Sequence, residues 1–309
     1  MKWWLSGTVL GAALLGTAVG ILLQKYGDAS GWIGSRLRDL GLYHYAYSTV
    51  APIQTATQSA VVPPEAMGQM RLFILAGQSN MSGRAELPES SASADQIYMF
   101  GNDYRWHLAQ EPVDSPAGQV DVVSLDDSAG YGPSLAFAER LRSLRSDRPV
   151  GLIPCAKGGS SIADWQRNLS DQSLYGACLK RVRAAAAMGE ISGVLFFQGE
   201  ADALDPKAFP SMRPAAETWA TNFEQLVTDL RQDLAQPDLP VVYAQIGALQ
   251  NAEKFPYWEV VRTQQEQVQL PHSRMITTSD LAMPDSAHFT QASYRTIGER
   301  FAEQLNQLL

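Results

Sequence analysis

The feature that most constrains the fold is an alternation of two kinds of segment that begins at Met70. Short apolar runs rich in β-branched and aromatic residues alternate with longer runs of helical periodicity. Alternation of this kind predicts a parallel sheet that is covered by helices on both faces. The predicted strands are 71–76, 96–100, 150–156, 193–199, 240–246 and 274–278. The predicted helices are 133–145, 173–188, 215–235, 255–269 and 290–308.

This pattern predicts one flavodoxin-like α/β/α sandwich with a central parallel sheet over residues 70–309. The run at 194–197 supports a buried sheet, because it is apolar without alternation, as a strand covered on both faces must be. Ligands of such sheets bind beyond the carboxyl ends of the strands. The residues that directly follow the strands are therefore the candidates for a functional site.

The chain before this domain has a different composition. The run from Trp3 to Leu23 is uncharged and long enough to cross a hydrocarbon core of about 30 Å. No A-x-A-like cleavage site follows it, which favours an uncleaved transmembrane anchor over residues 1–23 rather than a removed signal peptide. Residues 24–69 show no sustained period and are typical of a linker.

The charge and the metal-binding residue types exclude several classes of function. A formal net charge of −8 argues against nucleic acid as a partner, because nucleic acid requires a basic patch. The two cysteines form no CxxC pair, and the four histidines have no spacing typical of a zinc site. The sequence therefore predicts no metal and no other cofactor.

Four polar or glycine-rich clusters are expected at one edge of the predicted sheet, namely 77–80, 157–161, 198–202 and 285–288. The first of them contains Ser79, which follows a strand and a turn. A serine hydroxyl is a poor nucleophile unless a base removes its proton, and His288 is the natural base. Asp285 lies three residues before His288 and can orient the ring through Nδ1. The sequence predicts a nucleophile, a base and an orienting carboxylate.

Acyl transfer also requires donors that face the developing oxyanion. The backbone N–H groups of Ser79 and Gly159 are two candidates, and the side-chain amide of Gln198 is the third. Glu200 cannot donate while it is ionised, so we expect it to hold its loop or to bind substrate. The alternatives to an oxyanion role are that Gly159 only forms a turn and that Gln198 forms a hydrogen bond to a neighbouring loop.

Three further residues are predicted to contact substrate, and the sequence leaves alternatives open for two of them. Gln78 precedes the predicted nucleophile. Trp165 could stack on a sugar ring or lie in the core. Arg84 could bind a carboxylate of the substrate or form an ion pair on a helix surface.

The four motifs GQSNMSGR (77–84), GGSSIADW (158–165), QGEAD (198–202) and DSAHF (285–289) occur in this order. Together they closely resemble the carbohydrate O-acetylesterase branch of the SGNH hydrolases, which contains sialate O-acetylesterase-like and acetylxylan esterase-like proteins. The resemblance runs from about residue 71 to 309 and implies the SGNH hydrolase fold and a serine esterase without a metal. It implies Ser79 as nucleophile, with Asp285 and His288 completing the triad. The third motif departs from the wider superfamily, which usually has Asn where this chain has Gln198.

The predicted function is removal of O-acetyl groups from a carbohydrate (sialic acid, xylan or a cell-surface glycan) through a Ser-His-Asp triad and an acyl-enzyme. A lipid- or thioester-cleaving SGNH hydrolase and a non-catalytic cell-surface carbohydrate-binding module remain as alternatives. Because the usual substrates lie outside the cell, we expect a periplasmic or extracellular catalytic domain. The basic residues that follow the predicted anchor favour the opposite orientation.

The sequence leaves open whether Cys155 and Cys178 form a disulfide. An exported domain would meet an oxidising compartment that permits the bridge. Single cysteines also occur as small buried apolar side chains, and a bridge requires Cα atoms within about 7 Å, which a sequence cannot show.

Overall fold

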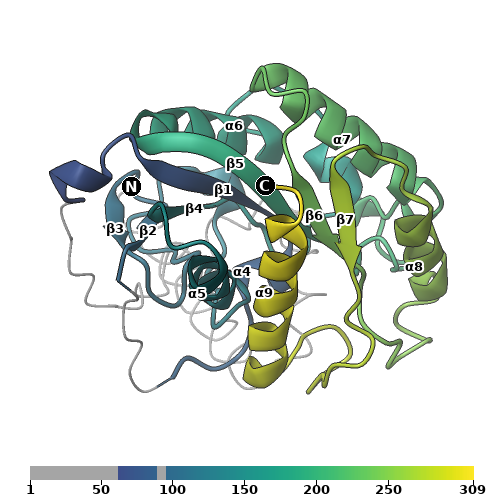
Figure 1. The fold of residues 1–309 in the computed structure, drawn as a ribbon. Coiled ribbons are helices and arrows are strands. Elements are labelled where there is room, and N and C mark those ends of the chain that lie inside the picture. The colour runs from purple at the N-terminus through teal and green to yellow at the C-terminus, as the bar shows by residue number, and fades with distance from the viewer. Residues whose placement is uncertain (1–61, 89–94) are drawn as a thin grey trace, which may run out of the picture. The chain divides into compact units, whose positions relative to one another are not determined.

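The computed structural model of the protein describes residues 62–88 and 95–309 (Figure 1). The transmembrane helix of the predicted fold class is not supported, since no helix within these ranges is long and apolar enough to cross a membrane. The predicted anchor over 1–23 and residues 24–61 of the predicted linker lie outside the described residues.

The described residues form one seven-stranded sheet with the order β3-β2-β4-β1-β5-β6-β7 (Figure 1). Its strands are β1 (Met70–Gly77), β2 (Ile97–Phe100), β3 (Trp106–Leu108), β4 (Val150–Pro154), β5 (Gly189–Phe197), β6 (Val241–Ala244) and β7 (Ser273–Ile276). All six predicted strands are found, and their neighbours pair in parallel.

The prediction of a wholly parallel sheet is wrong at one edge, because β3 pairs with β2 in the antiparallel direction. Residues 101–105 join these two strands and are too few for the crossover that a parallel connection needs. The sequence reasoning missed β3 because a strand of three residues has too little pattern to detect.

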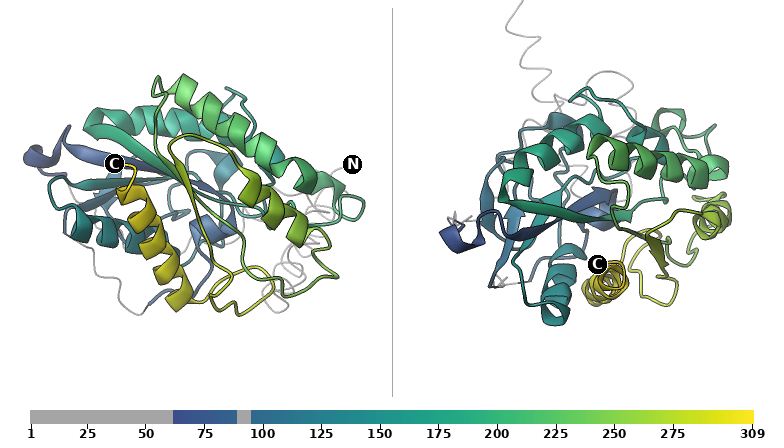
Figure 2. Two further views of the ribbon diagram at one scale, coloured as in Figure 1. Left: turned by 45° about the vertical axis from the view of Figure 1, so that its right-hand side comes forward. Right: turned by 45° about the horizontal axis from the view of Figure 1, so that its top comes forward.

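Helices cover both faces of the sheet, as predicted (Figure 2). They are α5 (Ser134–Leu144), α6 (Leu174–Ala185), α7 (Trp219–Asp233), α8 (Trp258–Gln267) and α9 (Gln291–Asn306), and a single turn, α4 (Ser79–Ser82), follows β1. The described residues also contain six short 3₁₀ helices, namely η2 (Pro64–Ala66), η3 (Val122–Ser124), η4 (Ile162–Trp165), η5 (Ala186–Met188), η6 (Pro210–Met212) and η7 (Ala216–Thr218).

Successive residues of the central strand β1 point into two separate cores. Leu72 and Ile74 pack in the core that α6, α7 and α8 cover, whereas Phe73 and Leu75 pack in the core under α5 and α9. All four side chains are buried, as expected for a strand with helices on both sides. The first core also includes Val62 and Ala66, which belong to the predicted linker. The domain boundary at residue 70 stays a prediction.

The disulfide that the sequence left open is formed in the structure between Cys155 and Cys178. The two Cα atoms lie 5.3 Å apart, and both side chains are buried. Cys155 directly follows β4 and Cys178 lies in α6. The bridge therefore fastens that helix to the carboxyl end of a strand, at the edge of the sheet where the functional site is expected.

Replacing both cysteines with alanine should lower the free energy of unfolding by about 3 kcal/mol, because the bridge restricts the unfolded chain over a separation of 23 residues. Urea unfolding of the oxidised wild type and of the double variant measures this difference. A reductant should destabilise the wild type and leave the double variant unchanged. Equal stability of the two oxidised proteins would contradict the prediction.

Glu111, which follows β3, is a buried carboxyl with an unusual proton affinity. Its Oε2 accepts a hydrogen bond from the Val113 N–H at 3.3 Å, and its Oε1 has no partner among the residues that the structure describes. Burial raises the pKa of Glu111 to about 8, more than the backbone hydrogen bonds lower it. The folded protein therefore keeps a proton here that the unfolded chain releases near its ordinary pKa of 4.5.

Because the unfolded chain binds fewer protons between these two pKa values, the free energy of unfolding should fall as the pH rises from about 5 to about 8. The buried carboxyls of Glu200 and Asp202, each with a pKa raised to about 7, act in the same direction. Glu111→Gln cannot ionise, so its stability should decline less steeply, most visibly between pH 7 and 8. Parallel stability–pH curves of wild type and variant would exclude a raised pKa at Glu111.

Candidate active site

Ser79 lies at a strand–turn–helix junction, as predicted. β1 ends at Gly77 and α4 begins at Ser79. The Gln78 N–H donates to the Phe197 carbonyl at 2.8 Å, so the turn is tied to the end of β5. A Cβ at Gly77 would lie 2.1 Å from that same carbonyl oxygen, and only glycine permits this close approach.

The structure brings the three predicted triad side chains together. His288 Nε2 lies 3.1 Å from Ser79 Oγ, and His288 Nδ1 lies 2.8 Å from Asp285 Oδ2. An ionised carboxylate accepts only, so Nδ1 carries the proton that donates to Asp285 and Nε2 is left able to accept the serine proton.

Asp285 is held by its own turn. Its Oδ1 accepts hydrogen bonds from the backbone N–H groups of Ala287 and His288, both at 2.7 Å. Burial alone would raise the pKa of Asp285, but the hydrogen bonds from the His288 ring and from the two N–H groups outweigh it and keep the pKa below its usual range. The carboxylate therefore stays ionised and fixes the ring by both its position and its charge.

Two of the three predicted oxyanion donors are available. Within residues 62–88 and 95–309, neither the Ser79 N–H nor the Gly159 N–H donates to a protein acceptor. The loop of Gly159 is tied to the end of β1, because the Lys157 N–H donates to the Gly77 carbonyl at 2.9 Å. The Ser79 N–H lies at the start of α4 and the Gly159 N–H in the loop between β4 and η4, and that loop is tied to the end of β1 by the bond from Lys157.

Gln198 does not fit the third donor position that was predicted for it. Its Nε2 donates to Ser160 O at 3.0 Å and to Asp202 Oδ2 at 2.5 Å, with Gln78 Oε1 at 3.2 Å. Its Oε1 accepts from the Trp219 indole at 2.8 Å. The side chain is fully buried. Its amide is therefore engaged inside the protein and is not available for an oxyanion.

Gln78 is also engaged within the protein rather than exposed for substrate. Its Oε1 accepts from the backbone N–H groups of Gly199 and Ala201, at 3.3 and 3.2 Å. The side chain is buried, so it fastens the residue before Ser79 to the loop that follows β5.

Arg84 forms an ion pair, which was one of its two open interpretations, although the partner Asp126 is buried and does not lie on a helix surface. A single nitrogen of Arg84, Nη2, donates to both carboxylate oxygens, at 2.9 and 2.7 Å. Asp126 also accepts from the Gly158 N–H at 2.8 Å and from the Ser82 hydroxyl at 3.0 Å. Burial would raise the pKa of Asp126, but the charges of Arg84 and Lys157 outweigh it and hold the pKa at about 2. This pair joins α4 to the loop that carries Gly159.

Trp165 and Glu200 are buried too, which favours the core for Trp165 and the holding of its loop for Glu200 over a contact with substrate. Trp165 lies in the core under α6 and α7, where its indole N–H donates to Ser160 Oγ at 3.0 Å. Glu200 accepts a hydrogen bond from the side chain of Asn80. The open interpretation of Trp165 is thus settled in favour of the core.

Sequence reasoning missed the roles of Asn80, Asp126 and Asp202. Asp202 accepts from the N–H groups of Ile162 and Ala215, at 2.9 and 2.8 Å, and so connects the loops that flank the site. Asn80 and Asp202 lie inside the quoted motifs. The motifs indicated that these residues belong to the site, but they did not indicate what the side chains bind. Asp126 lies outside every motif and gave no signal.

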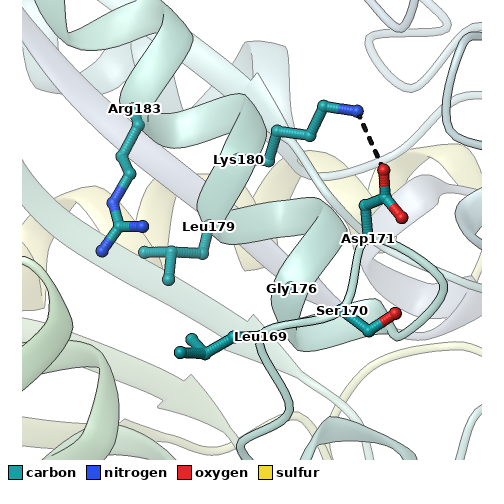
Figure 3. Close-up of a pocket in the computed structure, with 7 residues that line it drawn as sticks. All are labelled: Leu169, Ser170, Asp171, Gly176, Leu179, Lys180 and Arg183. Atoms are coloured by element: carbon teal, nitrogen blue, oxygen red, sulfur yellow. Dashed lines mark hydrogen bonds and ion pairs between the residues drawn. The ribbon is translucent and has the colours of Figure 1, made fainter.

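The structure also contains a pocket of about 400 Å³ beside α6 (Figure 3). Its lining residues include none of the predicted site residues, and Lys180 and Asp171 form an ion pair at its rim. In the described part of the chain, no cluster of three or more His, Cys, Asp or Glu side chains is arranged to hold a metal ion. The predicted independence from metals stays a prediction.

Comparison with known proteins places the domain among carbohydrate esterases. A sequence model of the family described as "carbohydrate esterase, sialic acid-specific acetylesterase" matches residues 69–307. A probable carbohydrate esterase of Arabidopsis thaliana is 32% identical over 263 residues, which are 78% of this chain and 90% of that protein. An X-ray structure of an Arabidopsis thaliana protein is 29% identical with a TM-score of 0.64, and the match covers 78% of this chain and 99% of that one.

Two more distant solved structures share the fold. A carbohydrate acetylesterase from Xanthomonas citri is 19% identical with a TM-score of 0.58, over 77% of this chain and 56% of that chain. NanS is 19% identical with a TM-score of 0.57, over 78% of this chain and 98% of that chain. At this level of identity, the likeness concerns the fold alone.

Arg84→Lys should lower the free energy of unfolding by about 2 kcal/mol, because the single amine of lysine cannot pair with the buried Asp126 and also make the hydrogen bonds that Arg84 Nη1 donates to Ser82 Oγ and the Gly83 carbonyl. The maximal rate of ester cleavage should fall while KM stays unchanged. Arg140→Lys is the matched control, since Arg140 pairs with Glu303 on the exposed surface and should change stability little. A raised KM with unchanged stability would instead place Arg84 in contact with substrate.

Proposed function

This chain belongs to the carbohydrate esterase family of sialic acid-specific acetylesterases, and on that premise we propose that Ser79, His288 and Asp285 remove an O-acetyl group from a carbohydrate. The activity class, a carbohydrate acetylesterase, follows from the family and from its relatives. The observation that carries the proposed triad is the continuous hydrogen-bonded chain from Asp285 through His288 to Ser79.

In the first half of the proposed reaction, Ser79 Oγ attacks the carbonyl carbon of the acetyl group while His288 Nε2 takes the hydroxyl proton. The N–H groups of Ser79 and Gly159 donate to the oxyanion of the tetrahedral intermediate. Asp285 stabilises the imidazolium that forms. When the intermediate collapses, the bond to the sugar oxygen breaks, and His288 returns the proton to that oxygen. The sugar leaves with a free hydroxyl, and Ser79 holds the acetyl group.

In the second half, a water molecule attacks the acetyl-serine carbonyl and gives its proton to His288. The same two N–H groups stabilise the second oxyanion. The intermediate then expels Ser79 Oγ, which takes the proton back from His288, and acetate is released. The cycle thus consumes one water and restores all three side chains.

The family description and the relatives support a carbohydrate ester as substrate, and sialic acid, xylan and a cell-surface glycan are the candidates. Met212 is a candidate for contact with the substrate, because its methyl carbon would lie 3.5 Å from a Cβ at Gly159. Acetate release from O-acetylated sialic acids, acetylated xylo-oligosaccharides and acetylated peptidoglycan fragments identifies the sugar. A specificity constant that is highest for a lipid ester or a thioester would overturn the proposed substrate class.

We also propose that the domain works in an oxidising compartment, periplasmic or extracellular. The Cys155–Cys178 disulfide supports this, because such bridges persist mainly outside reducing compartments. Alkylation of the protein in intact cells followed by mass measurement tests the proposal. Two alkylated cysteines without reductant would exclude it.

Ser79→Ala should reduce hydrolysis of p-nitrophenyl acetate by at least about 10³-fold, since no other group can form the acyl-enzyme. Ser192→Ala is the matched control, because Ser192 is another buried serine and its hydroxyl only donates to the Glu190 carbonyl. A fluorophosphonate should label the wild type and the control once per chain and leave Ser79→Ala unlabelled. Wild-type activity in Ser79→Ala would end the serine-esterase proposal.

A further inference from the structure

Asn80, the residue after Ser79, makes hydrogen bonds to three separate segments of the chain. Its Nδ2 donates to the Ala287 carbonyl at 2.8 Å and to the Glu200 carboxyl. Its Oδ1 accepts from the Tyr294 hydroxyl at 2.6 Å. These partners lie just before His288, in the loop after β5, and in α9, which runs beside α4 (Figure 1).

The side chain of Asn80 is fully buried, so it has no water to replace a lost partner. Its two amide protons and its oxygen are all used, which leaves it a single orientation. Leaving a buried polar group without its partner costs more than the hydrogen bond itself contributes. The three contacts therefore hold the amide firmly against the peptide that precedes the proposed base.

We propose that Asn80, Tyr294 and Glu200 form a positioning cluster that sets where His288 Nε2 lies relative to Ser79 Oγ. The inference rests on the proposed triad, and it assigns these three residues no contact with substrate. Asn80 is covalently next to Ser79 and holds the carbonyl of Ala287, which is covalently next to His288. The side chain of Asn80 thus connects nucleophile and base a second time, in addition to their own hydrogen bond.

Glu200 supports this cluster as a hydrogen-bond acceptor. It is buried, its Oε1 accepts from Asn80, and its Oε2 has no partner in the described ranges. No ion pair with Arg, Lys or His is formed by Glu200 among those residues. Burial raises the pKa of Glu200 to about 7. A glutamine at this position keeps an acceptor oxygen and the side-chain length, so it should replace the carboxyl in this role.

A purely structural role would affect stability without a specific effect on catalysis, and a matched pair of tyrosines separates the two. Tyr294 is 0% exposed and donates to Asn80 Oδ1 at 2.6 Å. Tyr175 is 1% exposed and donates to Asp233 Oδ2, also at 2.6 Å, but it lies on α6 outside the cluster. The change of either residue to phenylalanine deletes one buried hydroxyl from an equally short bond.

For p-nitrophenyl acetate, Tyr294→Phe should lower kcat about tenfold, with KM unchanged. Tyr175→Phe should keep the wild-type kcat whether or not its melting temperature falls. The second-order rate at which a fluorophosphonate labels Ser79 should fall with kcat in Tyr294→Phe, because labelling depends on the same base. Equal kcat and equal labelling rates in the two variants would overturn the inference.

The Glu200 variants supply a second test that does not depend on Tyr294. Glu200→Gln should keep kcat within about threefold of the wild type, whereas Glu200→Ala should lose about tenfold or more, because Asn80 loses an acceptor. Restoration by glutamine, measured on folded protein with a cooperative thermal transition, is expected from positioning. An alanine variant as active as the glutamine variant would remove Glu200 from the cluster and overturn the proposal.

Ser79→Ala, assayed beside these variants, keeps this inference distinct from the proposed function. If Ser79→Ala is inactive while Tyr294→Phe behaves like Tyr175→Phe, the triad stands and the positioning cluster is overturned. If Ser79→Ala keeps full activity, the triad itself fails and the inference falls with it.

Discussion

The site depends on how the end of β1 is held against the end of β5. The two strands run in parallel register up to the pair Gly77 and Phe197, where the backbones come too close for any side chain at Gly77. One residue later, the Gln78 N–H donates to the Phe197 carbonyl at the end of β5, and Gln78 Oε1 accepts from two backbone N–H groups of the loop that follows β5. The backbone that carries Ser79 is therefore held against the end of β5 by the hydrogen bonds of Gln78, independently of the contacts that Ser79 itself makes.

Buried carboxyls hold the remaining loops to this point. Asp126 accepts hydrogen bonds from the Arg84 guanidinium, the Ser82 hydroxyl and the Gly158 N–H. The positive charge of Arg84 offsets the cost of burying this carboxylate. Asp202 accepts hydrogen bonds from two backbone N–H groups and from the Gln198 amide, but from no cationic side chain in the part of the chain that the structure describes, and burial raises its pKa to about 7. The two carboxyls perform the same task with different electrostatics. The ion pair keeps its charge over the whole range of ordinary pH, whereas Asp202 changes its protonation near neutrality.

The sequence was sufficient for the strand and helix order and for the meeting of Ser79, His288 and Asp285, because these follow from periodicity and from motifs at strand ends. It was insufficient for Gln78, Trp165, Gln198 and Glu200, whose residue types suit both a substrate contact and a buried hydrogen bond. Only burial separates those two roles, and burial depends on which loops fold over the strand ends. The short strand β3 escaped for a related reason, since three residues carry no period.

The departure at Gln198 from the Asn of the wider superfamily changes how the proposed oxyanion site must work. The longer amide reaches Ser160 and Asp202, and it accepts the indole proton of Trp219, so it braces the loops instead of facing the reaction. In the proposed reaction, two backbone N–H groups then carry the oxyanion, and a backbone donor is only as well placed as its loop. Gly159 is placed through Asp126 and Asp202, and Ser79 through Gln78. The rate of this esterase should therefore depend on buried groups that never touch the substrate.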